Sequence, residues 1–308
     1  MIAGGIDLGG TKIEAQVFDA GWQVVARQRI ATPRDYPGLV TATADLVGWC
    51  EAQAGWALPV GVAAAGLINP ATGLALTANL AATGQPFPAD IAARAGRSVS
   101  YVNDCRAFTL SEAVFGAARG LSPAVGLILG TGVGGGVAVG GRLLHSPAAV
   151  GGEFGHFAVA AGPVVTHGLP VVRCGCGRTG CSETLISGTG LARIAAHLTG
   201  RDRTGRDWTA EAVAEARHTD PQAARIWAIW CEVVAEVLIT LCLTLDPACI
   251  VLGGGLSRAV GLVPDLTAAM IRAQLPGFAV PLLVLAQGGD ASGARGAAYA
   301  AWQEAGHD

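Results

Sequence analysis

Charged residues are scarce in this sequence, and lysine is nearly absent. Only 14% of the 308 residues are charged, and the net charge is −3. This balance gives no reason to expect nucleic acid or an anionic membrane as a partner. No uninterrupted apolar run reaches the roughly 18–20 residues that cross a bilayer. The start, MIAGGIDLGG, has neither a basic segment nor a cleavage site, so we expect no secretion signal and a cytoplasmic protein.

Apolar residues and glycine are abundant instead: 51% of the residues are hydrophobic, and 45 positions are glycine. A chain of this length buries a substantial core as one large domain or two modest ones. Its eight cysteines, without a secretion signal, favour free thiols or metal ligands over disulfides. The one lysine among the 20 lysine and arginine residues, Lys12, lies in a glycine turn. This position favours a functional role over chance survival on the surface.

Hydrophobic periodicity predicts an alternation of strands and helices. Strands are expected at residues 2–8, 13–19, 24–30, 60–68, 99–103 and 281–287. Two more lie on either side of the glycine turn in 124–144. A further strand, at 248–252, runs into glycines that are expected to open a helix. Helices are expected at 37–55, 104–118, 184–199, 208–216, 221–245 and 290–308, with loops at 160–182 and 200–207.

The strand–glycine turn–strand unit of residues 2–19 recurs at residues 125–139. This internal similarity predicts an α/β protein with two related domains that flank a cleft. We place a small domain at residues 1–118 and a large domain at 119–289. The C-terminal helix, 290–308, is expected to pack back on the small domain.

The two turns are Gly9-Gly10-Thr11 and the segment from Gly130 to Gly136, which contains Thr131. Successive glycine N–H groups can converge on phosphate oxygens. Neither turn fits the Walker pattern, and neither leads from a strand into a helix as a dinucleotide motif requires. One such turn is weak evidence, but two, one of them beside Asp7 and Lys12, indicate a phosphate site. A third cluster, Gly253 to Gly255, suits the sugar or base end of a nucleotide.

Three motifs together resemble the ROK family of bacterial sugar kinases and repressors. They are Asp7-Leu8-Gly9-Gly10-Thr11-Lys12, the glycines from Gly130 to Gly136, and Cys174-Gly-Cys176-Gly-x-x-Gly-Cys181-Ser-Glu183. The resemblance covers essentially the whole chain, and its cysteine motif is highly specific. It implies the actin-like, ribonuclease-H-like ATPase fold. The segments TPRD (32–35), GLILGTGVGGG (126–136), GGEFGHF (151–157) and GDASGARGAA (289–298) are most similar to those of the family's N-acetylglucosamine kinases.

The resemblance implies ATP as phosphoryl donor, with Mg²⁺ bound alongside the nucleotide. Asp7 is expected to hold Mg²⁺ through water, and Lys12 to lie near the transferred phosphate. The implied ATP-binding residues come from the three glycine clusters: Gly5, Ile6, Asp7, Leu8, Gly9, Gly10, Thr11, Lys12, Gly130, Thr131, Gly132, Val133, Gly134, Gly135, Gly136, Val137, Gly254 and Gly255.

Asp104 follows a predicted strand at the start of a helix, where a carboxylate is ordinarily a cap. Its match to the family's Asn-Asp motif instead implies a base that accepts the proton of the sugar's primary hydroxyl. Asn103 is then a sugar ligand, as are Asn79, Glu153, His156 and Glu183. The family usually continues Asp-Ala-Asn, whereas this chain has Asp104-Cys105-Arg106. The departure brings an arginine close to the site.

The three clustered cysteines are one short of a four-cysteine iron–sulfur site, and a Cys-x-Cys redox pair leaves the third unexplained. Tetrahedral zinc fits Cys174, Cys176 and Cys181 with His156 as fourth ligand. Four protein ligands leave no open position, so the zinc is expected to be structural. It would tie the loop of Glu183 to the segment of Glu153 and His156, and the other ring nitrogen of His156 would meet the sugar.

The sequence therefore predicts an ATP-dependent kinase that makes N-acetylglucosamine 6-phosphate. Glucose or N-acetylmannosamine are alternative substrates. A sugar-sensing repressor is a different class, but we expect no DNA-binding extension before Asp7, and Lys12 and Asp104 favour catalysis. The family resemblance also implies a homodimer.

Overall fold

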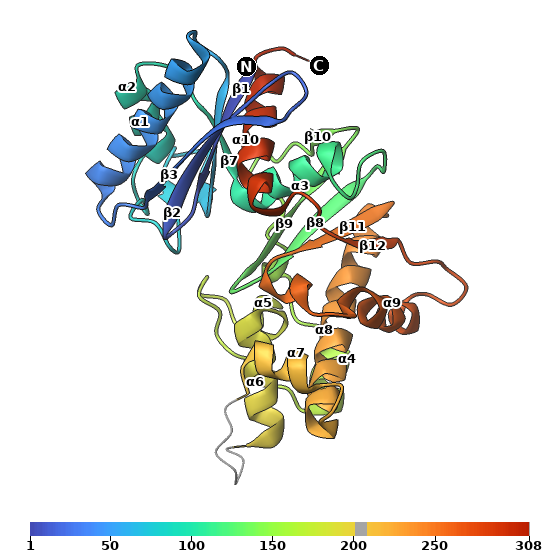
Figure 1. Ribbon diagram of the computed structural model, residues 1–308. Coiled ribbons are helices and arrows are strands. Elements are labelled where there is room, and N and C mark those ends of the chain that lie inside the picture. The colour runs from blue at the N-terminus through green and yellow to red at the C-terminus, as the bar shows by residue number, and fades with distance from the viewer. Residues whose placement is uncertain (201–207, 308) are drawn as a thin grey trace. The chain divides into compact units, whose positions relative to one another are not determined.

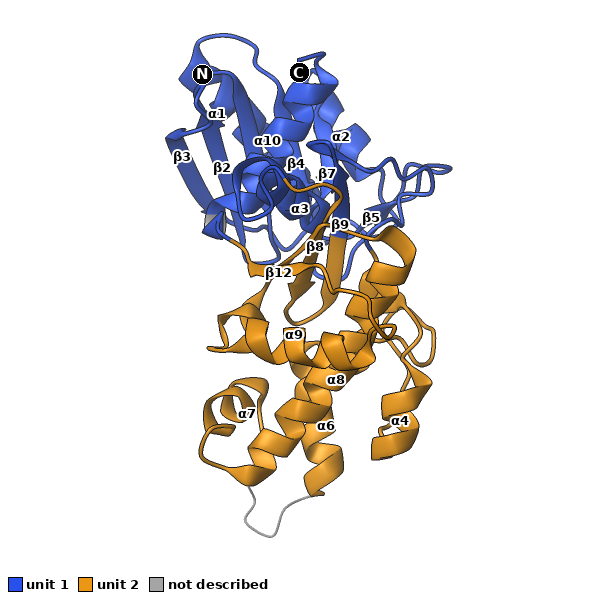
Figure 2. Ribbon diagram, turned by 90° about the vertical axis from the view of Figure 1, so that its right-hand side faces the viewer, with its two compact units in different colours: residues 1–120, 136–152, 287–308 blue, residues 121–135, 153–286 orange. Residues whose placement is uncertain are grey.

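The computed structural model describes residues 1–200 and 208–307 (Figure 1). The chain forms two compact units, coloured separately in Figure 2. Unit 1 comprises residues 1–120, 136–152 and 287–308, and unit 2 comprises 121–135 and 153–286. The loop expected at 200–207 lies almost entirely outside the described residues, and the domain boundaries set from the sequence stay a prediction.

The first sheet has the strand order β3-β2-β1-β4-β7. Its strands are β1 (Ala3–Leu8), β2 (Lys12–Phe18), β3 (Val24–Ala31), β4 (Val60–Ala64) and β7 (Ser100–Asn103). Strands β1, β2 and β3 form an antiparallel meander, while β4 runs parallel to both β1 and β7. Leu8 pairs with Ile13 across the first glycine turn.

The second sheet repeats this arrangement with the order β10-β9-β8-β11-β12. Its strands are β8 (Ala124–Leu129), β9 (Val133–Val139), β10 (Arg142–Leu143), β11 (Cys249–Gly253) and β12 (Leu282–Leu285). Strand β11 runs parallel to β8 and β12, as β4 does to its neighbours. The predicted recurrence of the strand–glycine turn–strand unit is confirmed. A small two-stranded sheet, β5 (Leu67–Ile68) and β6 (Ala75–Leu76), lies apart from both.

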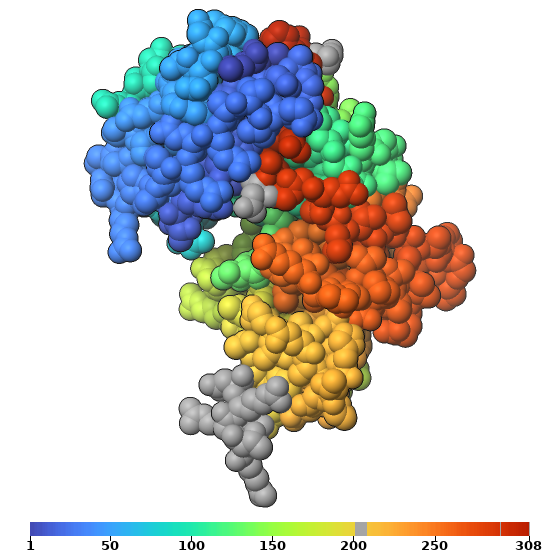
Figure 3. Space-filling view, in the orientation of Figure 1, coloured from blue at the N-terminus to red at the C-terminus, as the bar shows by residue number. Residues whose placement is uncertain are grey.

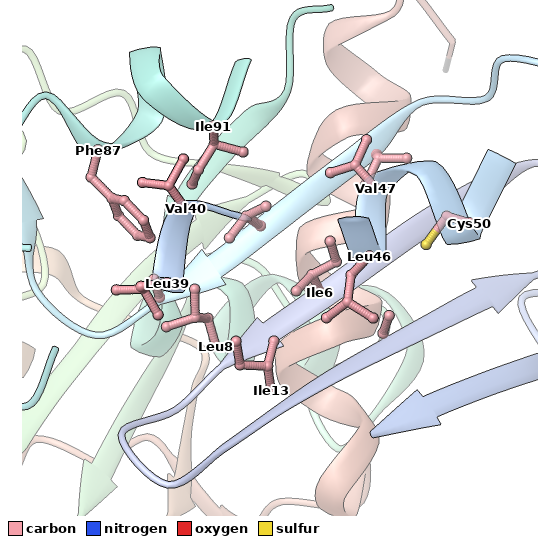
Figure 4. Packing of buried hydrophobic residues seen from close by; sticks show 14 of the residues in the cluster. Ile6, Leu8, Ile13, Leu39, Val40, Leu46, Val47, Cys50, Phe87 and Ile91 are labelled. Carbon is pink, nitrogen blue, oxygen red and sulfur yellow. The ribbon is translucent and has the colours of Figure 1, made fainter. Parts of the chain in front are cut away.

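Helices cover both faces of the first sheet. Helices α1 (Tyr36–Ala54) and α2 (Phe87–Ala95) pack on one face, where Leu39, Val47 and Ile91 meet Ile6 and Leu8 (Figure 4). Helix α10 (Ser292–Glu304) packs against β1, β4 and α3 (Asp104–Phe115). The space-filling view in the same orientation shows the N-terminal segments of unit 1, in blue, on this face (Figure 3).

Local signals explain where the long helices begin and end. Asp35 accepts a hydrogen bond from the Gly38 N–H at 2.8 Å to cap α1, which ends at Gly55 in the left-handed conformation, with φ of 76°. Asp220 caps α8 (Pro221–Leu245) in the same way, through the Gln222 N–H at 2.8 Å. These ends agree with the sequence-based prediction to within one residue.

Unit 2 is mainly helical outside its strands. Besides α8 it contains α4 (Ala161–His167), α5 (Glu183–Ile186), α6 (Gly188–Thr199), α7 (Ala210–Ala216) and α9 (Leu262–Ala273). Helix α8 packs against α6, α7 and α9. Short 3-10 helices occur at η1 (Phe154–His156), η2 (Gly255–Arg258) and, in unit 1, η3 (Gly289–Ala291).

Helix α8 is long and apolar enough to cross a membrane by length and composition, although two glutamates interrupt its apolar run. Within its most apolar window, however, 72% is buried inside the protein. A buried core helix passes the same test, so α8 is weak evidence for a membrane. The sequence analysis predicted this helix at 221–245 but considered only uninterrupted apolar runs, and therefore did not note that it passes this test.

Several expected elements were wrong in detail. The expected loop at 160–182 contains α4, and the expected helix at 184–199 is two helices, because Ser187 is extended (ψ 173°) and caps α6. The strand expected at 60–68 breaks at Gly66, whose φ is +106°. The third glycine cluster opens the short η2 and not an α-helix. Helices α2 and α9 were missed.

Glu112 of α3 is completely buried and holds distant segments together. Its Oε2 accepts hydrogen bonds from the N–H groups of Ala117 and Gln287, both at 3.0 Å. Its Oε1 accepts from the Gly288 N–H at 2.7 Å and the Ser292 hydroxyl at 3.2 Å. The carboxylate thus fixes the start of α10, about 175 residues away in sequence, against α3.

We expect Glu112→Ala to lower the free energy of unfolding by about 2–4 kcal/mol, because it leaves several half-buried donors without an acceptor. Chemical denaturation measures this change. Glu112→Gln should lower the free energy of unfolding by less, since one acceptor oxygen remains. The control is Glu304→Ala, on the exposed surface of α10. A loss for Glu112→Ala no larger than for Glu304→Ala would contradict the role given to this carboxylate.

Candidate functional site

The first glycine turn joins β1 to β2 in unit 1. The Gly9 N–H donates to Lys12 O at 3.0 Å, and the Thr32 hydroxyl donates to Gly9 O at 2.6 Å. Gly10, Thr11 and Lys12 are exposed, so this part of the turn is open to a ligand. Gly5, Ile6 and Leu8 are buried within the sheet, and a Cβ on Gly5 would lie 1.8 Å from the Ala294 carbonyl oxygen of α10. Their position indicates packing more than ligand contact.

Asp7 lies next to the beginning of α10. A Cβ added at Gly293 would come within 2.8 Å of the Asp7 carboxyl carbon, so only glycine permits this approach. Asn79 lies against the same turn, with its Cβ 3.1 Å from the Cβ position of Gly10. Asn79 is exposed. The structure therefore brings together Asp7, Gly10 and Asn79 at one end of the first sheet.

Asn103 and Asp104 lie where β7 passes into α3. Asn103 caps the helix, because its Oδ1 accepts from the N–H groups of Cys105 at 3.0 Å and Arg106 at 3.2 Å. Its Nδ2 donates to Gly66 O at 3.1 Å and keeps a second N–H for another acceptor. The residue that caps α3 is therefore Asn103, and not Asp104, the ordinary cap candidate in the sequence.

Burial raises the pKa of the Asp104 carboxyl above its ordinary value, although a hydrogen bond from the Cys105 N–H at 2.8 Å opposes the shift. No salt bridge to Asp104 occurs among the described residues. A half-buried carboxylate of raised pKa is a better proton acceptor than an exposed one.

The second glycine turn borders a large cavity in unit 2. The Gly188 N–H donates to Gly130 O at 2.8 Å, which ties the turn to the start of α6. The cavity has a volume of about 830 Å³, and Gly130, Thr131 and Gly255 contribute to its lining. Gly254, with φ of +87°, lies too close to the Leu129 backbone for any Cβ. Two of the three predicted glycine clusters therefore meet at one cavity.

The sequence reading missed most of this cavity's wall. Trp208, Thr209 and Arg217 line it, together with Val260 after η2. Arg217 donates hydrogen bonds to the Ala214 and Val260 carbonyls, and its guanidinium lies 4.4 Å from the centre of the Trp227 ring. The sequence carried only a weak signal for these residues, because the two ends of α7 and the segment after η2 meet only by tertiary packing.

The predicted metal ligands lie together in unit 2. The donor atoms of His156, Cys174, Cys176 and Cys181 are all within 4.8 Å of one another. The Cys176 and Cys181 sulfurs are 3.6 Å apart, and the Cys174 sulfur lies 3.8 Å from His156 Nδ1. Burial raises the pKa of the Cys174 and Cys181 thiols, whereas a backbone hydrogen bond at Arg178 lowers that of exposed Cys176.

Glu183 connects this cysteine cluster to the second glycine turn. Its Oε2 accepts a hydrogen bond from the Val133 N–H at 2.9 Å, and its Oε1 lies 3.5 Å from the Cys174 sulfur. Glu153 Oε2 is 3.6 Å from His156 Nε2, so the ring nitrogen that does not face Cys174 faces this carboxylate. Glu153, His156, Glu183 and Val133 thus form one local group in unit 2.

The remaining predicted phosphate residues lie along β9. Val133, Gly135, Gly136 and Val137 are buried, and Gly134 is half-buried. A Cβ on Gly135 would clash with the Gly126 carbonyl at 2.1 Å and with the Phe154 ring at 2.7 Å. These glycines therefore serve close packing, and the exposed part of the turn is Thr131 and Gly132.

Comparison with known proteins identifies the class to which this fold and these sites belong. The ROK family matches residues 3–304, and the chain belongs to this family. Its fold is the predicted actin-like ATPase fold. Among solved structures, the ROK hexokinase from Thermus thermophilus is 32% identical, with a TM-score of 0.86 and 99% of each chain covered. A ROK glucokinase from Streptomyces griseus, solved with glucose and AMPPNP, is 29% identical with a TM-score of 0.76, over 98% of this chain and all of that one.

The chain is also similar to two sugar kinases in sequence. The N-acetylgalactosamine kinase of Shewanella sp. (strain ANA-3) is 38% identical over 296 residues, 96% of this chain and 94% of the relative. The N-acetyl-D-glucosamine kinase of Escherichia coli O127:H6 is 36% identical over 299 residues, 96% of this chain and 97% of the relative.

The raised pKa of Asp104 determines how this carboxyl group makes the free energy of unfolding depend on pH. Between the pKa of Asp104 in the unfolded chain and its higher pKa in the folded protein, the native state holds a proton that the unfolded chain has released. The free energy of unfolding therefore falls as the pH rises through this window. Asp104→Asn removes the ionisation. We expect the variant to have a higher Tm than the wild type at neutral pH, with the difference shrinking in acid towards the ordinary Asp pKa. Calorimetry at several pH values measures it, and a lower Tm for the variant at neutral pH would refute the argument.

Proposed function

We propose that this protein transfers the γ-phosphoryl group of ATP to the 6-hydroxyl of N-acetyl-D-glucosamine. The observation that carries the proposal is the half-buried Asp104, with its raised pKa, at the start of α3 in a ROK chain. The relatives named as N-acetylglucosamine and N-acetylgalactosamine kinases support an N-acetylhexosamine as acceptor. N-acetylgalactosamine is the second candidate because the N-acetylgalactosamine kinase of Shewanella is 38% identical to this chain.

In the proposed reaction, the Asp104 carboxylate accepts the proton of the sugar 6-hydroxyl as that oxygen attacks the γ-phosphorus. The new P–O bond forms while the bond from the γ-phosphorus to the ADP oxygen breaks, and ADP leaves with the electron pair. Asn103, through its second Nδ2 hydrogen, binds a sugar hydroxyl. Glu153, His156 and Glu183 bind further hydroxyls, since each sugar hydroxyl both donates and accepts.

The two open glycine turns are proposed to bind the phosphates, with Lys12 neutralising the charge that develops on the transferred group. A cavity of about 830 Å³ is within the size range of small-molecule sites and would take the adenosine part of ATP. Half-buried Asp7, at the end of β1 beside the first turn, offers a carboxylate for Mg²⁺, which would supply charge neutralisation of the nucleotide phosphates when bound. Trp208 and Val260 give this cavity apolar surface for a base.

The function is tested by ADP release with a panel of glucose, galactose, mannose and their N-acetyl derivatives, with ³¹P NMR to locate the phosphate. We expect turnover with N-acetylglucosamine and phosphate on oxygen 6. A protein that releases ADP with none of these sugars would contradict the proposal. Turnover of glucose or N-acetylmannosamine in preference to the other sugars would support the alternative substrates instead.

Asp104→Asn should keep sugar affinity but lower kcat by about 10²–10⁴-fold, because the amide cannot accept the proton. Steady-state kinetics and a sugar-binding titration separate the two effects. Asp45→Asn, an exposed position on α1, is the matched control and should keep wild-type kcat. Near-normal turnover by Asp104→Asn would remove Asp104 from the role of base.

We also propose that His156, Cys174, Cys176 and Cys181 hold one structural zinc. A Zn–S bond of about 2.3 Å gives a tetrahedron with edges of about 3.7 Å. The separations of 3.6 Å between two sulfurs and 3.8 Å between sulfur and imidazole agree with such edges. With Nδ1 towards the metal, His156 Nε2 points to the side of Glu153, where both groups can meet a sugar hydroxyl. The raised pKa of buried Cys174 and Cys181 means that zinc binding has to displace protons from these thiols.

Cys176→Ser is expected to lower both the zinc content, from about one ion per chain, and the sugar affinity, the latter by roughly 10–100-fold. The physical reason is that the loss of one ligand releases the segment that carries Cys174 and Glu183. Elemental analysis and a sugar titration measure the two quantities, and Cys242→Ser in α8 is the control. Full zinc content in Cys176→Ser would show that the ligands are wrong. Normal sugar affinity of zinc-free wild type would show that the metal does not organise the site.

A cytoplasmic location, a homodimer and the absence of nucleic-acid partners remain predictions from sequence. The sugar-sensing repressor class stays the less favoured alternative.

A further inference from the structure

A second cavity, of about 340 Å³, lies in unit 1 beside Asn103. Arg106 lines it from the first turn of α3, and Leu67, Leu143 and Leu144 contribute apolar wall. Because Asn103 faces this cavity and is the expected sugar ligand of unit 1, a substituent on the bound sugar can reach it. The cavity is larger than a water molecule requires and fits a small substituent.

Arg106 enters this cavity with most of its hydrogen-bonding capacity unused. Its Nη2 donates to Leu144 O at 2.9 Å, while the guanidinium carries five N–H groups in total. No carboxylate within the described parts of the chain lies within salt-bridge distance of Arg106. Burial lowers the pKa of Arg106, yet an arginine stays charged in proteins. The hydrogen bond of this guanidinium goes to a backbone carbonyl, while Glu304 of α10 lines the same cavity beyond salt-bridge distance.

The cavity's chemistry matches an acetamido group. Such a group presents one strong acceptor, the carbonyl oxygen, and one methyl group. Arg106 offers charged N–H donors, and the leucines offer a surface for the methyl. A hydroxyl at the same sugar carbon is too short to use both features.

We propose that the acyl group of an N-acetylhexosamine occupies this cavity and that Arg106 donates a hydrogen bond to its carbonyl oxygen. Arg106 is therefore a specificity-determining residue for sugars with a 2-acetamido group over sugars with a 2-hydroxyl. This inference rests on the proposed kinase function and adds the group by which the acceptor is selected.

The test compares Arg106→Met, which keeps the length of the side chain but has no N–H group, with wild-type protein. Values of kcat/KM are measured for N-acetylglucosamine and for glucose at saturating ATP. We expect the value for N-acetylglucosamine to fall roughly 10–100-fold, mainly through KM, since a charge-assisted hydrogen bond is lost. The value for glucose should change less than about threefold. Arg94→Met on the exposed surface of α2 is the control and should change neither.

A change of substrate gives a measurement that does not depend on the folding of a variant. The neutral sugar 2-O-ethylglucose carries a two-carbon substituent of nearly the same size but has no carbonyl oxygen. For wild-type protein, kcat/KM should fall on this sugar by the same factor as Arg106→Met loses on N-acetylglucosamine. For Arg106→Met, kcat/KM should differ little between this sugar and N-acetylglucosamine. Arg106→Lys, which keeps a positive charge, should retain part of the selectivity.

Equal losses on N-acetylglucosamine and glucose in Arg106→Met would overturn the inference. So would competition of inorganic phosphate with glucose in wild type but not in Arg106→Met, because the cavity would then be an anion site. Equal kcat/KM values of the wild-type protein for glucose and N-acetylglucosamine would also refute the inference. If wild type phosphorylates no sugar, the proposed function itself fails.

Discussion

The close approach of helix α10 to the first sheet is the constraint on which the arrangement of unit 1 depends. Cβ atoms at Gly5, Gly61 and Gly296 would lie within 2.0 Å of carbonyl oxygens, two of them on α10 and one, at Ala107, on α3. Backbone therefore packs directly on backbone. Gly293 of the same helix abuts the Asp7 carboxylate. One helix thus sets the position of Asp7 and of the helix that begins with Asp104.

Glu112 stabilises that arrangement from the other side. Its two oxygens accept four hydrogen bonds, two of them from backbone N–H groups at the entry to α10. Asp104, on the same helix, receives few compensating donors, so burial raises its pKa. The helix therefore carries one carboxylate that stabilises the fold and one whose ionisation is disfavoured. A stored cost of this kind is typical of functional groups, which are arranged for reaction and not for stability.

In unit 2, Glu183 has a comparable connecting position. It lies between the Val133 N–H of the glycine turn and the Cys174 sulfur. A movement of the cysteine cluster therefore moves the carboxylate that contacts the turn. The proposed zinc, held by four protein ligands, would through this arrangement act on the site without touching the substrate.

Short-range features were readable from the sequence because their causes are local. Both glycine hairpins, the bounds of the helices expected at 37–55 and 221–245, and the cysteine motif with His156 depend on segments of a few residues or on specific family motifs. The family and its fold followed from these motifs. Four other features did not follow from the sequence. They are the wall of the 830 Å³ cavity, the cap role of Asn103, the burial of Gly5 and Ile6, and the contact of Glu112 with Gln287. Each depends on segments far apart in sequence, and only the tertiary packing of helices on the two sheets decides which of them meet.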